Sequence, residues 1–177
     1  MASVNISEAS PLLQAQARLA THVTEAAGIH PPRPEWRHNS VEALLLSHGR
    51  WFRPAPMPSD RPLGVEGLCF ANAAQHAARF GLAYVEGYAL ASGVVGLPHA
   101  WCAHPDGTVE DPTWNTDGHA YLGIPFTELY LREQEQRGNI NQLLFEQHLN
   151  GWDLLRDGVD GAIAANVGRP YTTASNG

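Results

Sequence analysis

The sequence predicts an α+β protein in which helices come first, an antiparallel sheet occupies the middle, and helices follow again. Apolar residues at helical spacing, with serine caps and glycine stops, mark the first part of the chain. Short β-rich runs separated by turn residues mark positions 82–126, and a helix-capping threonine follows at position 127. With 177 residues, the chain is expected to fold as a single domain with its own core.

Three helices are expected before the sheet, and each ends at a glycine. The first begins at Ser10-Pro11, an N-cap followed by proline at the first helical position, and stops at Gly28. The second is capped by Ser40, spans residues 40–47 and is ended by Gly49. The third opens near Cys69, runs through an alanine-rich stretch and stops at Gly81.

The middle of the chain predicts four strands. The second and third form a hairpin around the turn His104-Pro105-Asp106-Gly107. The strands are expected over residues 82–90, 97–103, 108–111 and 120–126.

After the sheet, Thr127 caps a helix that reaches about Gln136. A further helix is expected near residues 141–149, with a weaker segment at 159–165. Residues 1–167 form the predicted domain, with an N-terminal helical part up to about residue 60. Within it, the proline-rich stretch 52–62 is expected to be irregular. The small, polar tail 168–177 is expected to be disordered.

Composition excludes several classes of function. Eighteen acidic residues against eleven basic ones give a net charge of −7, and no basic run is interleaved with aromatics, so nucleic acid is not an expected partner. All eleven basic residues are arginine, which excludes lysine chemistry. Neither a membrane span nor a signal peptide is visible. Two cysteines allow one disulfide at most, so a reduced, cytoplasmic protein is expected. The oligomeric state is left open.

Three polar residues follow one another in contexts that each suit one catalytic task. Cys69 opens a helix, His99 lies in a short strand, and Asp111 ends the next strand. This order supplies a thiolate nucleophile, an imidazole base and a carboxylate that orients the imidazole. The first turn of a helix favours a thiolate, because its free N–H groups and dipole attract negative charge.

The hairpin should bring His99 and Asp111 together, because residue 99 lies opposite residue 111 or 112. Asp111 would then fix the imidazole tautomer and leave the other ring nitrogen for Cys69. The Cys69 helix is expected to pack on the face that carries this pair. Cys102, three residues after His99, is expected to point the other way, into the core.

At these residues the chain resembles the transglutaminase-like branch of the papain-like cysteine enzymes. The matching segments are Gly67-Leu68-Cys69-Phe70, His99-Ala100-Trp101 and Asp111-Pro112-Thr113-Trp114, within residues 64–126. The resemblance implies a helix bearing the cysteine packed on an antiparallel sheet, and a Cys69–His99–Asp111 triad without a cofactor. It also implies a peptide, protein or other amide-containing substrate, and hydrolysis, deamidation or acyl transfer through a thioester.

One departure from the papain pattern concerns the oxyanion. The segment just before Cys69 contains no glutamine, although the Cys69 backbone N–H can supply a first donor. Trp51 is a candidate for the second donor through its indole N–H. Trp101 and Trp114 are candidates for lining an acyl-substrate groove. Glu86, on the strand expected beside that of His99, either contacts substrate or faces solvent.

Two alternatives stay open. One is a catalytically silent papain-like domain used for binding or as an accessory protein. The other is a zinc-binding domain, since four residues between positions 69 and 104 are of the types that bind zinc. These are Cys69, His99, Cys102 and His104. The zinc alternative requires His99 and Cys102 to converge, which strand alternation opposes. The remaining histidines are expected at the surface or as capping groups. They are His22, His30, His38, His48, His76, His119 and His148.

Overall fold

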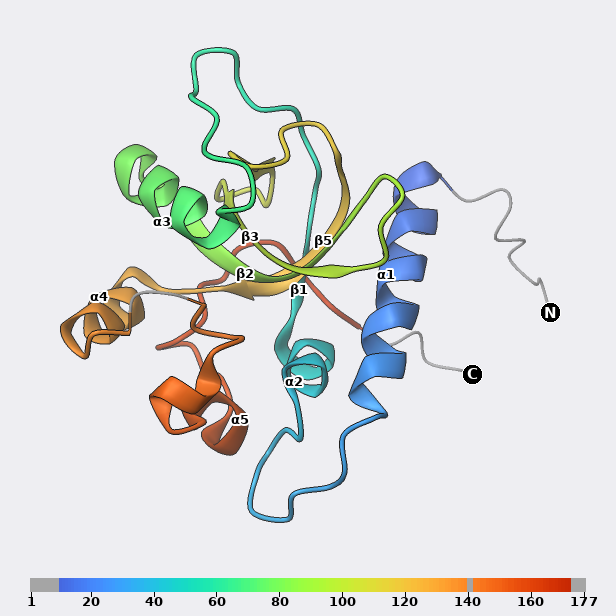
Figure 1. Ribbon diagram of the computed structural model, residues 1–177, viewed down its shortest axis with the longest axis vertical. Helices are drawn as coiled ribbons and strands as arrows, with labels where there is room; N and C mark the ends of the chain where they lie inside the picture. Colours follow the sequence, from blue (N-terminus) through green and yellow to red (C-terminus); the bar gives the residue numbers. More distant parts are fainter. Residues whose placement is uncertain (1–9, 140–141, 173–177) are drawn as a thin grey trace.

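The computed structural model describes residues 10–139 and 142–172, which form an α+β fold built on one six-stranded sheet (Figure 1). Helices flank the sheet at both ends of the chain. In chain order the elements are α1 (Pro11–Ala27), α2 (Val41–His48), β1 (Arg50–Phe52), α3 (Cys69–Phe80), β2 (Ala83–Ala91), β3 (Leu97–Ala103), β4 (Val109–Glu110), β5 (Gly118–Pro125), α4 (Glu128–Gln136), the 3-10 helix η2 (Gln147–Asn150), α5 (Asp153–Asp157) and β6 (Arg169–Pro170).

The sheet is antiparallel and curls on itself. Its strand order is β4-β3-β2-β5-β1-β6, and the named strands pair antiparallel throughout. The chain just after β1 also meets the chain just before β4 in a parallel bridge between Arg53 and Thr108. Strands from distant positions in the sheet are thereby brought together. The curl gives the sheet an inner and an outer face.

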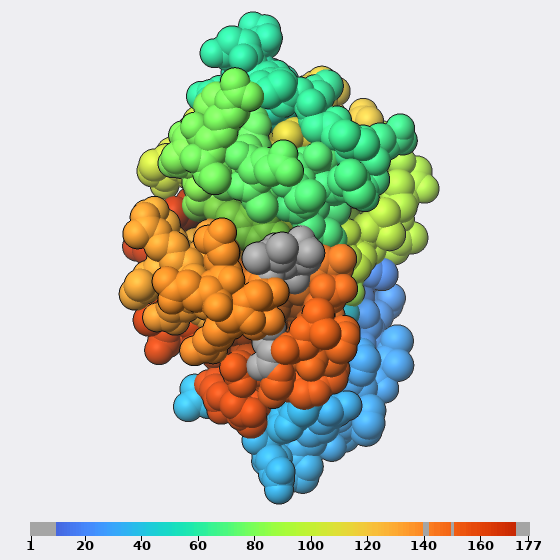
Figure 2. All heavy atoms as spheres, turned by 60° about the vertical axis from the view of Figure 1, so that its left-hand side comes forward, coloured from blue at the N-terminus to red at the C-terminus, as the bar shows by residue number. Residues whose placement is uncertain are grey.

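Each face of the sheet has its own core. Side chains from five strands meet on the inner face, where β1 and β4 both contribute. The inner cluster consists of Phe52, Val85, Ala89, Trp101, Ala103, Val109 and Tyr121. The outer face carries the larger core, because helices supply apolar side chains such as Leu19, Leu44 and Ala73 to it. In the space-filling view, α3 and the loop before it lie above the α4–α5 region (Figure 2).

The capping signals identified in the sequence form as predicted. The side chains of Ser10, Ser40 and Thr127 each accept a backbone N–H in the first turn of α1, α2 and α4. α3 ends at Gly81, whose φ of 67° lies in the left-handed region that glycine tolerates best. The hairpin between β3 and β4 is closed by the hydrogen bonds Gly107 N to His104 O and His104 N to Thr108 O.

The sheet includes two strands that the sequence did not predict. β1 lies within the part expected to be helical, immediately before the prolines begin at Pro54. β6 falls in the tail 168–177 that was expected to be disordered, and it pairs with β1. Both strands are too short to show a side-chain period, so their pairing depends on tertiary structure. Residues 173–177 lie outside the described residues.

The C-terminal helices also differ from expectation. In place of one helix near 141–149, the described part holds a turn followed by η2, and α5 comes next. Residues 140 and 141, at the start of that expected helix, lie outside the described residues. Segment 159–165 is not helical, and its Ala164 forms a bridge with Phe126. Backbone pairing to β5 thus replaces helix formation there. None of the helices in the described residues is long and apolar enough to cross a membrane.

Candidate active site

The strongest feature of the inner face is a buried hydrogen bond between His99 and Asp111. The register pairs Cys102 with Glu110, so Asp111 follows β4 on the side of the sheet that also carries His99. His99 Nε2 lies 2.8 Å from Asp111 Oδ2, and the two residues are 1% and 0% exposed. The prediction that these side chains meet on one face is confirmed. The predicted register is wrong, because the pairing of Cys102 with Glu110 places residue 111 opposite residue 101 and not opposite residue 99.

Asp111 is held by four hydrogen bonds. Its Oδ1 accepts the backbone N–H groups of Thr113 and Trp114 at 2.9 and 3.0 Å. Its Oδ2 interacts with His99 and accepts the Tyr121 hydroxyl at 2.9 Å. Burial alone would raise the pKa of Asp111, but the bond to His99 and the backbone N–H groups lower it below its usual range. The carboxylate is therefore fixed in position and charged.

His99 is fixed from three sides. Burial lowers the pKa of His99, but the hydrogen bond to Asp111 and the interaction with Cys69 outweigh it and raise the pKa above its ordinary value of 6.5. Trp114 stacks on the imidazole with ring centroids 3.8 Å apart and planes inclined by 13°. Because Asp111 occupies Nε2, the remaining ring nitrogen, Nδ1, is the one available to the Cys69 thiol.

Cys69 is the first residue of α3 and is only half-buried. The residue before it, Leu68, has no side-chain acceptor to cap the helix. The first N–H groups of α3 are therefore left without an intrahelical partner, as at any helix start. This end of the helix attracts negative charge, which suits a thiolate and an oxyanion.

The expectation that α3 packs on the face of His99 is wrong. α3 packs on the outer face, where the Cys102 thiol donates to the Ala73 carbonyl oxygen at 3.2 Å. The small side chains of Ala73 and Ala77 allow this close approach to the sheet. The first turn of α3 interacts with His99 through Cys69.

Cys102 points away from His99, as predicted. It is 0% exposed, and burial raises the pKa of its thiol well above the ordinary range. His99 and Cys102 thus lie on opposite faces of β3, and the zinc alternative loses the convergence that it requires. In residues 10–139 and 142–172, no group of three or more His, Cys, Asp or Glu side chains is suited to hold a metal ion.

The three tryptophan candidates fall in different places. Trp114 lies at the site, stacked on His99. Trp101 shares the inner face and is fully buried, and its ring centroid lies 6.3 Å from that of His99. Trp51 belongs to the outer core and packs on Tyr171, so the structure does not bring it to His99. A groove-lining position is thus compatible with Trp114 and not with the enclosed Trp101.

Glu86 lies on the outer face, fully buried, and does not face solvent as one alternative expected. Its carboxylate accepts the Tyr84 hydroxyl at 2.7 Å and the backbone N–H groups of Leu143 and Leu144 at 2.8 and 2.7 Å. It therefore attaches the segment before η2 to the sheet. Burial raises the pKa of Glu86 to about 7, although these three hydrogen bonds act in the opposite direction.

Sequence reasoning missed two contributors to the site. The turn after Asp111 could have been predicted, because an Asp side chain commonly accepts N–H groups two and three residues ahead. Tyr121 could not, because it lies on β5, and only the order β3-β2-β5 brings it near Asp111. Among the histidines expected at the surface, His76 is instead 5% exposed and bonded to Glu110.

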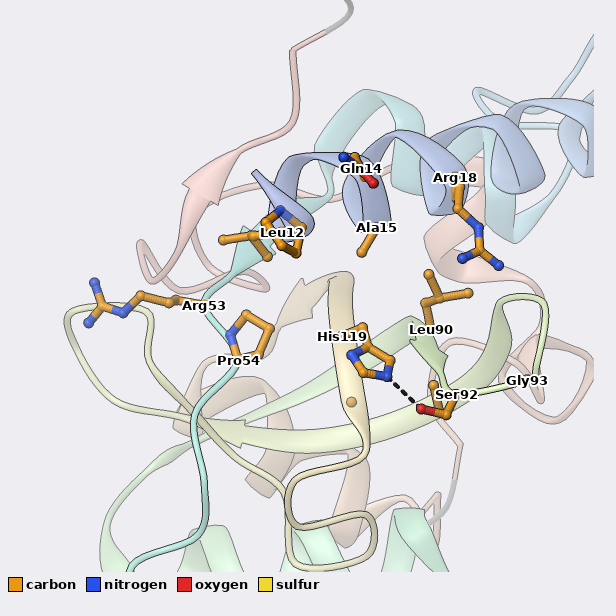
Figure 3. A pocket seen from close by; sticks show the side chains of 13 residues that line it. Leu12, Gln14, Ala15, Arg18, Arg53, Pro54, Leu90, Ser92, Gly93 and His119 are labelled. Atoms are coloured by element: carbon orange, nitrogen blue, oxygen red, sulfur yellow. Dashed lines mark hydrogen bonds between the residues drawn. The ribbon is translucent and has the colours of Figure 1, made fainter. Parts of the chain in front are cut away.

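Two surface hollows of about 520 and 550 Å³ lie along α1, and neither is lined by Cys69, His99 or Asp111. Figure 3 shows the first, between α1 and the ends of β2 and β5. Ser92 and His119 share a hydrogen bond of 2.8 Å on one wall. The Arg53 guanidinium points out of it and pairs with Asp106 instead.

The fold and site together define an α+β protein with a curled antiparallel sheet and a buried His–Asp pair beside a half-buried cysteine. No known protein-family model, curated protein or solved structure matches this chain.

Gly118 controls the position of the Tyr121 hydroxyl. A Cβ at position 118 would lie 1.8 Å from that oxygen, so Gly118→Ala should push the Tyr121 side chain off Asp111. We expect the substitution to lower the free energy of unfolding by about 1–3 kcal/mol. The loss should be clearly smaller in a Tyr121→Leu background, where the overlapping atoms are gone. Urea unfolding of the four proteins measures this coupling, and strictly additive losses would contradict it.

Glu86 should make stability depend on pH. Its pKa is raised from 4.5 to about 7, so its favourable contribution is complete below pH 4.5 and is lost as pH rises through 7. Relative to Glu86→Gln, the wild type should lose about 3 kcal/mol of unfolding free energy over this range.

The control is Glu42→Gln, at a second buried carboxylate. Despite its burial, the hydrogen bond from Tyr88 helps to lower the pKa of Glu42 below 4.5, so its contribution is lost toward acid instead. Urea unfolding from pH 4 to 8 checks both variants. Parallel pH curves for wild type and Glu86→Gln would show that Glu86 is not the titrating group.

Proposed function

We propose that this chain is a cysteine-dependent acyl-transfer enzyme acting on peptide, protein or other amide bonds. The single observation that carries the proposal is the arrangement around His99. One ring nitrogen is held by the buried Asp111, and the imidazole also interacts with a half-buried cysteine at a helix start. A base oriented by a carboxylate and placed beside a reachable thiol is the arrangement that covalent catalysis by cysteine needs.

The chemistry follows from these positions. The Cys69 sulfur attacks the carbonyl carbon, and His99 takes the thiol proton on Nδ1. The backbone N–H groups at the start of α3 stabilise the oxyanion that forms. His99 then gives its proton to the leaving amine, and a thioester to Cys69 remains. Water or a second amine attacks the thioester, which gives hydrolysis, deamidation or transamidation. Asp111 stays ionised and orients the imidazole throughout.

The fold is compatible with a papain- or transglutaminase-like core. In that arrangement a helix opens with the nucleophile and packs on an antiparallel sheet that carries the histidine and the acid. α3, β3 and the end of β4 supply these parts here. The inner aromatic cluster around Trp101, Tyr121 and Trp114 adds a packed support around the imidazole. Members of this group also include domains that have lost catalysis, so the test must measure chemistry at Cys69.

Alkylation separates the two cysteines. With Cys69 paired to His99, iodoacetamide should modify Cys69 rapidly well below pH 8, whereas Cys102 should stay unmodified until the protein unfolds. Mass spectrometry of the labelled peptides measures both rates. Asp111→Asn should slow the labelling of Cys69 by about 10-fold or more, because the imidazole loses its orienting partner. Asp106→Asn, at the exposed turn, is the matched control and should have little effect.

An activated ester extends the test to turnover. p-Nitrophenyl acetate should acylate Cys69, and the acetyl group should be found on that cysteine after acid quench. Cys69→Ser should abolish the adduct. Slow, equal labelling of both cysteines that rises only above pH 8 would count against the enzyme and favour a binding domain.

A further inference from the structure

One side of α3 carries polar residues in line with the nucleophile. Asn72 and His76 follow Cys69 by three and seven positions, a spacing that places them along one side of a helix. All three make contacts toward the chain around Asp111. Cys69 interacts with His99, Asn72 bonds to Thr113, and His76 bonds to Glu110.

Asn72 joins α3 to the chain just after Asp111. Its Nδ2 donates to the Thr113 hydroxyl at 2.9 Å and to the Val65 carbonyl oxygen at 2.7 Å, and its Oδ1 accepts the Val65 N–H at 3.1 Å. Gly64 leaves room for this amide, since a Cβ there would lie 2.2 Å from Asn72 Cγ. The Gly64 N–H donates to the Pro112 carbonyl oxygen at 2.7 Å, which ties the loop before Cys69 to the same turn.

His76 joins α3 to the residue just before Asp111. Its Nε2 lies 2.6 Å from Glu110 Oε2, with side chains only 4% and 2% exposed. Glu110 Oε1 lies 2.8 Å from His104 Nε2, and Arg61 Nε lies 4.0 Å from Oε2, the oxygen that faces His76. Glu110 and Asp111 are adjacent, so their side chains leave the strand toward opposite faces. Glu110 meets the helix, and Asp111 meets His99.

From these contacts we propose that Asn72 and His76 are positioning residues that set the distance between the Cys69 sulfur and the His99 imidazole. The inference rests on the proposed function, because it concerns the same site. The two bonds attach the Cys69 helix at positions −1 and +2 of Asp111, the residue that fixes His99. Neither side chain contacts the reacting atoms in this scheme.

The need for such bonds follows from how α3 packs. Apart from the weak bond from the Cys102 thiol to the Ala73 carbonyl oxygen, its contact with the sheet is made by the small side chains of Ala73 and Ala77, and apolar contact is non-directional. Small side chains form only shallow ridges on the helix surface, so they do little to stop the helix from shifting along its axis. Hydrogen bonds depend steeply on distance and angle, so they fix the position that apolar contact leaves free. A shift of 1 Å at a reacting centre can cost about 100-fold in rate.

The test measures Cys69 alkylation by iodoacetamide from pH 5 to 9 in the full chain. His76→Phe keeps the ring packed on Phe80 but removes the bond to Glu110, and Asn72→Ala removes the bond to Thr113. Each should slow Cys69 labelling at pH 6–7 by about 10- to 100-fold. The matched control is Tyr88→Phe, which removes one bond to another buried carboxylate, that of Glu42. Labelling in this control should stay within about twofold of wild type.

Cys102 reports folding in every sample, because it is labelled only when the core opens. If a variant exposes Cys102, Thr113→Val tests the same link more mildly, since Thr113 is only half-buried. Unchanged low-pH labelling in folded His76→Phe and Asn72→Ala proteins, or equal slowing by Tyr88→Phe, would overturn the positioning role. Wild-type Cys69 without low-pH reactivity would overturn both proposals. A third outcome separates the two proposals. If the wild type is reactive at low pH and the variants are slowed, but the wild type never forms an acyl-enzyme, only the enzymatic function is overturned.

Discussion

The buried hydrogen bond between His99 and Asp111 is the interaction on which the rest of the site depends. A carboxylate with no exposure to water is costly unless it is paired and hydrogen-bonded. Asp111 meets this condition with His99, the Tyr121 hydroxyl and two backbone N–H groups. The same bonds orient the imidazole, and Trp114 covers it by stacking. The bonds that satisfy the buried Asp111 carboxylate are therefore the same bonds that orient the His99 imidazole.

The curl of the sheet separates two tasks between its faces. The inner face is filled by aromatic and small residues that hold the His–Asp pair. The outer face binds the helices, including α3, which delivers Cys69 to the edge of the inner site. Glu110 and Asp111 connect the faces, because adjacent residues of an extended strand point in opposite directions.

Buried carboxylates also act far from the site, as Glu86 does where it secures residues 143 and 144 to β2.

Local signals in the sequence predicted much of this structure. Serine and threonine caps gave α1, α2 and α4, and the His104–Gly107 turn gave the hairpin that joins His99 to Asp111. Features that depend on distant pairing were out of reach. β1 and β6 are short segments that pair 118 or more residues apart, and Tyr121 reaches Asp111 only because β5 lies beside β2. The face of the sheet on which α3 packs was predicted wrongly, because the sequence of an alanine-rich helix does not indicate which face of a sheet it will cover.

The most direct measurement is the titration of the His99 ring protons by NMR in the wild type and in Asp111→Asn. Burial alone lowers the pKa of His99, and the contacts with Asp111 and Cys69 raise it above 6.5. We therefore expect a wild-type midpoint above 6.5 and a clearly lower midpoint in Asp111→Asn, where burial persists without the carboxylate charge. A wild-type midpoint at or below 6.5 that does not move in Asp111→Asn would contradict a His99 held by Asp111.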